Sequence, residues 1–181
     1  MKNSLLIKNA SIVDGTGSDA YIGDVSIHDG IISDIGKVDG DFENTIDANG
    51  LTLAPGFIDI HTHFDPQLCW DGYATPSIEH GVTTVVTGNC SLSLAPIRDG
   101  GEDKIISMFQ VIEDIKKPTF DAAVPFSWET FGEYLDHIKP NLGINVGALI
   151  GHSAVRLYVM GEDSQKRKAT DEEIKEMCDI V

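Results

Sequence analysis

Short apolar runs separated by tight-turn signals fill the first part of the chain. Between residues 4 and 54, runs rich in Val, Ile and Leu alternate with Asp-Gly and Asn-Gly pairs. These pairs tolerate the positive φ angles of two-residue hairpin turns. Asp29-Gly30 lies within DVSIHDGIISDI, and Asn49-Gly50 precedes a strand that ends near Pro55. We therefore predict β-hairpins at both pairs, in an all-β unit over residues 1 to 54.

The hydrophobic pattern changes at residue 55. Apolar runs at 56–63, 81–90 and 142–152 alternate with longer stretches that are compatible with helices, as in βα units around a parallel sheet. Each run is mostly apolar on both faces, which is typical of strands covered by helices on one side and by a barrel core on the other. Residues 55 to 181 are thus predicted to contain the first βα units of a barrel.

Two sequence signals predict the start of a helix, one between the apolar runs and one after the last of them. Thr75-Pro76 offers an N-cap and a proline at the first helical position, and Gly81 offers a stop. Thr170 followed by Glu173 forms a capping-box pattern. We expect a short helix before Gly81 and a final helix that begins at Thr170 and runs through Met177.

The number of barrel-type strands is small. A closed barrel of this kind has eight strands and typically ~250 residues, whereas three runs are found in 181 residues. We therefore expect an N-terminal fragment or one piece of an assembly. Its open edge would be covered by the remainder of the barrel or by an oligomeric partner.

The segment PGFIDIHTHFD, residues 55 to 65, carries the strongest chemical signal. Side chains alternate along a strand, so His61 and His63 point to the same side and Thr62 points away. Two imidazoles on one side can hold a zinc ion at the C-terminal rim where barrel enzymes place their chemistry. The alternative is a chance pair on an exposed strand.

A cysteine follows the next apolar run, in TGNC. If the two strands are parallel neighbours ~4.8 Å apart, the Cys90 thiolate can share an ion with the two histidines. The alternative, an inert buried thiol, is our interpretation of Cys69 and Cys178. His28, His80 and His137 have no partner at metal-binding spacing and are interpreted as structural or surface residues.

At this point the sequence resembles a known family. PGFIDIHTHFD followed by HGVTTVVTGNCSLSLAPIR is similar to the D-aminoacylase and N-acyl-D-amino-acid deacylase branch of the metal-dependent amidohydrolases. In that branch a GNC cysteine replaces the usual bridging lysine carbamate. HSAVRLYVMG and KATDEEIKEM resemble the longer members of the branch, so the similarity covers essentially the whole chain.

The resemblance implies a fold and a metal site. It places a small β-sandwich over residues 1 to 54 and an α/β, TIM-like barrel from residue 55 onwards, truncated at 181. The matching metal positions are His61, His63 and Cys90, for one or two Zn²⁺ ions. Family members complete the site with two further histidines and an aspartate that acts as general acid/base, all of which we expect beyond residue 181.

The reaction implied is zinc-assisted hydrolysis of the amide bond of small N-acyl-D-amino acids. Without the aspartate, the 181-residue chain should be inactive by itself. One alternative is a cyclic amidohydrolase of the dihydroorotase or hydantoinase type, against which the TGNC cysteine argues. Another is a non-catalytic metal-binding module.

Four further residues are candidates for substrate binding. Asp65 is in phase with His63 and could orient a ligand or the substrate, although it could equally cap a loop. His152, Ser153 and Arg156 follow the third apolar run at the same rim, where a substrate role and a structural role are about equally supported.

Charge and hydropathy limit the partners. The formal net charge of -16 argues against nucleic acids and anionic membrane surfaces. The acidic residues are scattered, as in GEDKIISMFQVIEDIKK, and are interpreted as solvated helix faces. No apolar run approaches the ~20 residues of a membrane span, and no signal peptide is recognised, so the expected compartment is the cytoplasm.

Overall fold

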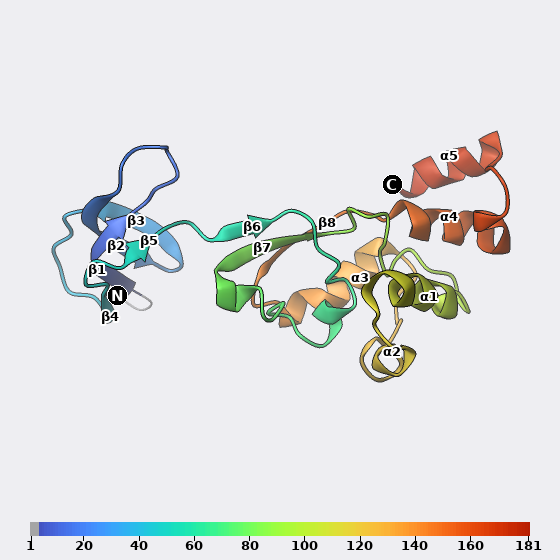
Figure 1. The fold of residues 1–181 in the computed structure, drawn as a ribbon, viewed down its shortest axis with the longest axis horizontal. Helices are drawn as coiled ribbons and strands as arrows, with labels where there is room; N and C mark the ends of the chain where they lie inside the picture. Colours follow the sequence, from blue (N-terminus) through green and yellow to red (C-terminus); the bar gives the residue numbers. More distant parts are fainter. Residues whose placement is uncertain (1–3) are drawn as a thin grey trace. The chain divides into compact units, whose positions relative to one another are not determined.

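The computed structural model describes residues 4–181. They divide into two compact units, one ending at Pro55 and the other spanning Gly56–Val181. Each unit contains its own β-sheet (Figure 1). Strands and helices together give the chain an α/β fold, as predicted.

The first unit is a single mixed sheet. All five strands formed by residues 4–55 belong to it, in the order β3-β2-β1-β4, with β5 also paired to β1. A small apolar core of Ala10, Ile12, Val25 and Ala48 lies against this sheet. The strands are β1 (Ser4–Ile12), β2 (Tyr21–His28), β3 (Ile31–Gly36), β4 (Asn44–Asp47) and β5 (Thr52–Leu53).

The hairpin predicted at Asp29-Gly30 is confirmed. β2 and β3 are antiparallel and His28 pairs with Ile31. Asp29 has φ 50 and Gly30 has φ 79, so both central residues adopt the left-handed conformation that a two-residue turn of this type requires.

The hairpin predicted at Asn49-Gly50 is wrong. Both residues have positive φ, but β4 and β5 on either side of them both run parallel to β1. Asn49 and Gly50 form a short irregular turn between β4 and β5, opposite the bulge in β1 at Asn9. The Asn9 carbonyl accepts a hydrogen bond from the Gly50 amide at 2.8 Å. Asn49 and Gly50 thus adopt turn conformations, as predicted. The bulge in β1 accommodates them, so β5 continues in the same direction as β4.

The second unit is built on a parallel sheet in the order β6-β7-β8. Its strands are β6 (Phe57–Asp59), β7 (Val82–Thr87) and β8 (Asn145–Ala148). The three apolar runs therefore form three parallel strands, as predicted, although each strand is shorter than its run. Figure 1 shows the three strands side by side.

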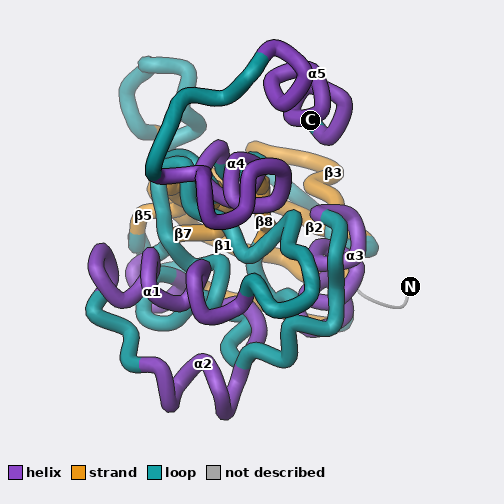
Figure 2. Tube along the Cα trace, turned by 90° about the vertical axis from the view of Figure 1, so that its right-hand side faces the viewer, coloured by secondary structure: helices purple, strands orange, loops and turns teal. Residues whose placement is uncertain are grey.

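Five α-helices in the described residues follow and connect these strands, with loops of considerable length between them (Figure 2). One apolar core joins β7 to four of the helices through buried residues such as Val85, Phe109, Phe120, Tyr134 and Leu157. None of the helices in residues 4–181 combines the length and apolarity that a bilayer crossing requires. The helices are α1 (Glu102–Glu113), α2 (Lys117–Ala123), α3 (Phe131–Ile138), α4 (His152–Met160) and α5 (Asp171–Ile180), and the short 3₁₀ helices are η1 (Gln67–Cys69), η2 (Ile78–His80), η3 (Lys139–Asn141) and η4 (Gly161–Gln165).

The capping box of α5 is confirmed. The Thr170 hydroxyl accepts from the Glu173 amide at 3.2 Å, and the Glu173 carboxylate accepts from the Thr170 amide at 2.8 Å. These reciprocal bonds satisfy two amide groups that the first turn of the helix leaves free.

The helix predicted from Thr75-Pro76 is only the single turn η2. It begins after Ser77, because the amide and hydroxyl of Thr75 donate to Asp71 instead of capping a helix. Gly81 ends the turn with φ 87, as predicted.

Gly88 joins the end of β7 to the loop that carries Cys90, and its position excludes a side chain. It has φ +84, and a Cβ atom built on it would lie 2.0 Å from the carbonyl oxygen of Leu149, just beyond β8. Both the backbone conformation and the close approach of the two strand ends therefore require glycine.

We predict that Gly88→Ala destabilises the chain by at least about 1–3 kcal/mol, the cost of the strained backbone position alone, because the overlap with the Leu149 carbonyl adds to it. Gly132→Ala is the matched control, since Gly132 lies in α3 and its Cβ would meet only Thr130 Oγ1 at 4.0 Å. This control should change stability by less than about 1 kcal/mol, in the stabilising direction. Urea unfolding followed by circular dichroism measures both, and equal midpoints for the two variants would contradict the prediction.

Candidate metal centre

The chain beyond β6 remains extended alongside β7. The amide and the hydroxyl of Thr62 both donate to the carbonyl of Val86, each at 2.9 Å. Thr62 is consequently buried, while His61 is exposed and His63 is half-buried. The Thr62 side chain faces away from the two imidazoles, as alternation along an extended segment requires.

Cys90 lies in the loop after β7, which is anchored by hydrogen bonds of the residues on either side of it. The side-chain amide of Asn89 donates to the carbonyl of Ile60 on one side. The carbonyl of Ser91 accepts from the Ser153 amide at 3.0 Å on the other side. These two bonds fix the loop at the edge where β6 and β7 end.

The structure brings His61, His63 and Cys90 together. One ligand atom from each lies within 4.8 Å of the other two. His61 Nε2 and Cys90 Sγ lie 2.7 Å apart. The ring centroids of the two histidines are 5.6 Å apart.

His63 has a carboxylate partner that the sequence analysis missed. Its Nδ1 contacts a carboxylate oxygen of Glu113, the last residue of α1. Its Nε2 is buried and has no hydrogen-bond partner among residues 4–181. Glu113 is exposed, as predicted for a solvated helix face, and its carboxylate contacts His63 in addition. A carboxylate in the last turn, where the helix dipole disfavours negative charge, was the signal that could have identified it.

The three side chains fit a zinc ion by chemistry and approximately by distance. Zinc accepts imidazole nitrogen and thiolate sulfur, and the bond lengths of a tetrahedral site imply ligand-to-ligand separations of roughly 3.3–3.6 Å. His61 Nε2 and Cys90 Sγ, at 2.7 Å, are somewhat closer than that range, and all three ligand atoms lie within 4.8 Å of one another. The Nε2 atom of His63 is buried and has no hydrogen-bond partner among residues 4–181, as expected of an atom that faces an ion.

Asp65 lies deeper than the cluster. It is 1% exposed, and neither carboxylate oxygen has a hydrogen-bond partner among the described residues. Burial raises the pKa of this carboxyl group to about 7, because the charged form loses its hydration. Among the described residues the carboxylate is therefore shielded from solvent and makes none of the hydrogen bonds of a loop cap.

The three other candidates for substrate binding are divided between two hollows. Ser153 and Arg156 line a hollow of about 770 Å³ that Cys90 also lines. His152 lines a different hollow, of about 960 Å³, between α4 and α5, and Arg156 lines this second hollow as well. Only Ser153 and Arg156 therefore share a surface with the cluster.

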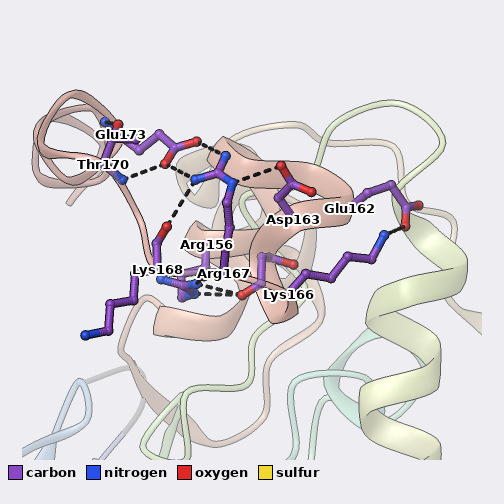
Figure 3. Close-up of polar contacts among 9 residues, drawn as sticks. Arg156, Glu162, Asp163, Lys166, Arg167, Lys168, Thr170 and Glu173 are labelled. Carbon is purple, nitrogen blue, oxygen red and sulfur yellow. Dashed lines mark hydrogen bonds and ion pairs between the residues drawn. The ribbon is translucent and has the colours of Figure 1, made fainter.

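Arg156 forms hydrogen bonds to the segment between α4 and α5. Its Nε and Nη2 donate to the carbonyl of Ser164 at 3.0 and 2.7 Å, and Nη2 also donates to the carbonyl of Arg167 at 2.9 Å. Arg167 in turn pairs with Glu173 in α5 and with Asp163 (Figure 3). These contacts give Arg156 a structural role in ordering the chain between the two helices.

The remaining histidines and cysteines lie outside the cluster. His28 stacks on Phe42, His80 contacts the carbonyl of Pro76, and His137 stacks on Trp128. Cys69 is half-buried, and burial raises the pKa of its thiol to about 12. Cys178, interpreted as a buried thiol, is exposed on α5.

Comparisons with known proteins show the family to which the chain belongs. A sequence model of the amidohydrolase family matches residues 44–181. The chain is 35% identical to the D-aminoacylase of Alcaligenes xylosoxydans xylosoxydans over 98% of its own length and 34% of that protein. It therefore spans about a third of the length of this relative.

Solved structures show the same similarity. A D-aminoacylase studied for its binuclear metal center matches with a TM-score of 0.79 and 31% identity, over 97% of this chain and 35% of that one. An N-acyl-D-glutamate deacylase from Bordetella bronchiseptica, solved with zinc and a phosphonate inhibitor, matches with a TM-score of 0.73 and 30% identity, over 98% of this chain and 35% of that one. The chain thus belongs to the amidohydrolase family, and its predicted resemblance to the D-aminoacylase and deacylase branch is confirmed.

Proposed function

We propose that this chain supplies the metal-binding part of a zinc-dependent hydrolase that cleaves the amide bond of N-acyl-D-amino acids. The observation that carries the proposal is the convergence of His61, His63 and Cys90 at the edge where β6 and β7 end. The similarity to a D-aminoacylase and to a zinc-containing deacylase supports the substrate class and the metal.

The residues of this chain would hold the metal ion and orient the substrate. The proposed site contains one or two zinc ions. His61, His63 and Cys90 would together hold one ion. A bound zinc ion lowers the pKa of water and polarises the acyl carbonyl. The hollow beside Cys90, with the hydroxyl of Ser153 and the apolar side chains of Leu92 and Met108 on its walls, would receive the acylated amino acid. The aspartate that carries the proton would come from outside residues 1–181.

We also propose how the two units fit a complete protein. Residues 1 to 54 would belong to a small β-sandwich, and residues 55 to 181 to the first βα units of a TIM-like barrel. The edge strand β6 supports this, since Phe57 and Ile58 are 68% and 63% exposed. Additional strands or a partner chain would cover these apolar side chains and the free edge.

We predict that His61→Ala, His63→Ala and Cys90→Ser each weaken zinc binding by at least tenfold, because each removes one of the three ligands that residues 4–181 bring together. Competition with a chromophoric chelator measures the affinity. Cobalt(II) gives a second signal, since the sulfur-to-cobalt charge-transfer absorption should disappear in Cys90→Ser.

Cys178→Ser and His80→Ala are the matched controls. Both side chains are exposed and lie outside the cluster. They should leave zinc affinity and the cobalt spectrum unchanged. Wild-type chain that binds no zinc at neutral pH would contradict the proposed metal site.

A second prediction concerns the reaction. The zinc-loaded 181-residue chain should not hydrolyse N-acetyl-D-amino acids, because the proposed proton carrier lies outside it. A chimera of the Alcaligenes D-aminoacylase in which these residues replace their aligned counterpart should hydrolyse the D-substrates and not the L-substrates. Cys90→Ser in that chimera should abolish the activity.

Release of the free amino acid, measured with a chiral separation, follows the reaction. A folded, zinc-loaded chimera that acts on neither enantiomer would argue against the proposed substrate class. Turnover by the 181-residue chain alone would show that the proton carrier lies within it.

A further inference from the structure

We propose that Glu113 is a positioning residue of this metal centre, which holds His63 so that Nε2 is the atom offered to the metal. This inference rests on the proposed function, because it concerns the orientation of one proposed ligand. The pair joins the segment after β6 to the last residue of α1, 50 positions apart in the sequence.

The first observation is the contact itself. His63 Nδ1 contacts a carboxylate oxygen of Glu113, and the two side chains are 18% and 32% exposed. The carboxylate can only accept when ionised, so Nδ1 carries the proton and donates. Partial burial protects this bond from competition by water.

The second observation is the state of the other ring nitrogen. A neutral imidazole has one donor and one acceptor, so a proton on Nδ1 leaves a lone pair on Nε2. Nε2 is buried and has no hydrogen-bond partner in residues 4–181. Buried polar atoms are nearly always satisfied in native proteins, so an unpartnered acceptor beside two other metal-ligand types indicates an atom kept for an ion.

The third observation is the unfavourable place of the carboxylate. Glu113 ends α1, where the helix dipole disfavours negative charge. Among the described residues, no lysine or arginine forms an ion pair with it, and His63 is the partner that it has. Its neighbour Asp114 is exposed and pairs with Lys116 instead.

Glu113 contacts the ligand His63 and is not itself a metal ligand. The cluster of groups whose ligand atoms all lie within 4.8 Å of one another comprises His61, His63 and Cys90, and does not include Glu113. Carboxylates that accept from the second nitrogen of a metal-bound histidine fix its tautomer and ring orientation. The geometry assigns this role to Glu113.

The experiment measures zinc affinity in three variants of the 181-residue chain. Glu113→Ala should weaken binding by about 10–100-fold, the usual effect of losing such a partner. Glu113→Gln keeps an acceptor but loses the charge, and should weaken binding less. Asp114→Asn removes the same charge one residue away without touching His63, and should leave the affinity within about threefold.

A second readout separates positioning from general stability. Nitrogen-15 correlation spectra of the metal-free chain should show His63 as the Nδ1-H tautomer in the wild type and in Asp114→Asn. In Glu113→Ala the Nε2-H tautomer should become populated. A merely structural role would change the unfolding midpoint without changing the tautomer.

The outcomes distinguish this inference from the proposed function. If the wild type binds no zinc, the proposed metal site fails. If the wild type binds zinc and Glu113→Ala binds it equally well with His63 unchanged, only the role of Glu113 is overturned. If Glu113→Ala does not fold, the zinc affinity of Glu113→Gln is the test. A Glu113→Gln affinity equal to that of Asp114→Asn would overturn the inference.

Discussion

The pair of hydrogen bonds from Thr62 to the carbonyl of Val86 fixes the phase of the segment after β6 against β7. With Thr62 held inward, His61 and His63 must lie on the opposite side of the segment. Because β6 and β7 are parallel, their ends meet at one edge, and Cys90 follows Val86 closely enough to reach His61. A shift of one residue in this pairing would exchange the two faces and turn both imidazoles away from the thiol.

Features governed by local rules could be predicted from the sequence. The Asp29-Gly30 turn, the capping box of α5 and the alternation of His61, Thr62 and His63 each depend on a few neighbouring residues. The three parallel strands followed from apolar runs of the right length. The convergence of two histidines and Cys90 needed only the further assumption that neighbouring strands are parallel.

Features that depend on distant partners could not be predicted. The Asn49-Gly50 pair does not reverse the chain, because the bulge at Asn9 in β1 accommodates it. Glu113 reaches His63 only because α1 packs where it does. The depth of Asp65 likewise depends on its surroundings, where Tyr134 donates to its backbone carbonyl.

The interior below the cluster contains polar atoms that a stable core would not otherwise keep. Asp65, Thr87 and His63 all present buried atoms without hydrogen-bond partners in the described part of the chain. Such groups reduce stability. Their concentration at one edge of the sheet accords with the proposed metal centre, since functional sites are where proteins depart from the rules of a stable core.

The exposed thiol of Cys90 has a practical consequence. Its sulfur lies 2.7 Å from His61 Nε2 and is open to solvent, so dissolved oxidants reach it when no cation shields it. Conversion to a sulfinic or sulfonic acid is irreversible for most proteins and removes the thiolate. A sample stored under air without reductant would then lose ion-binding capacity while its circular dichroism spectrum stayed the same, and ageing of this kind could be mistaken for an intrinsically weak site.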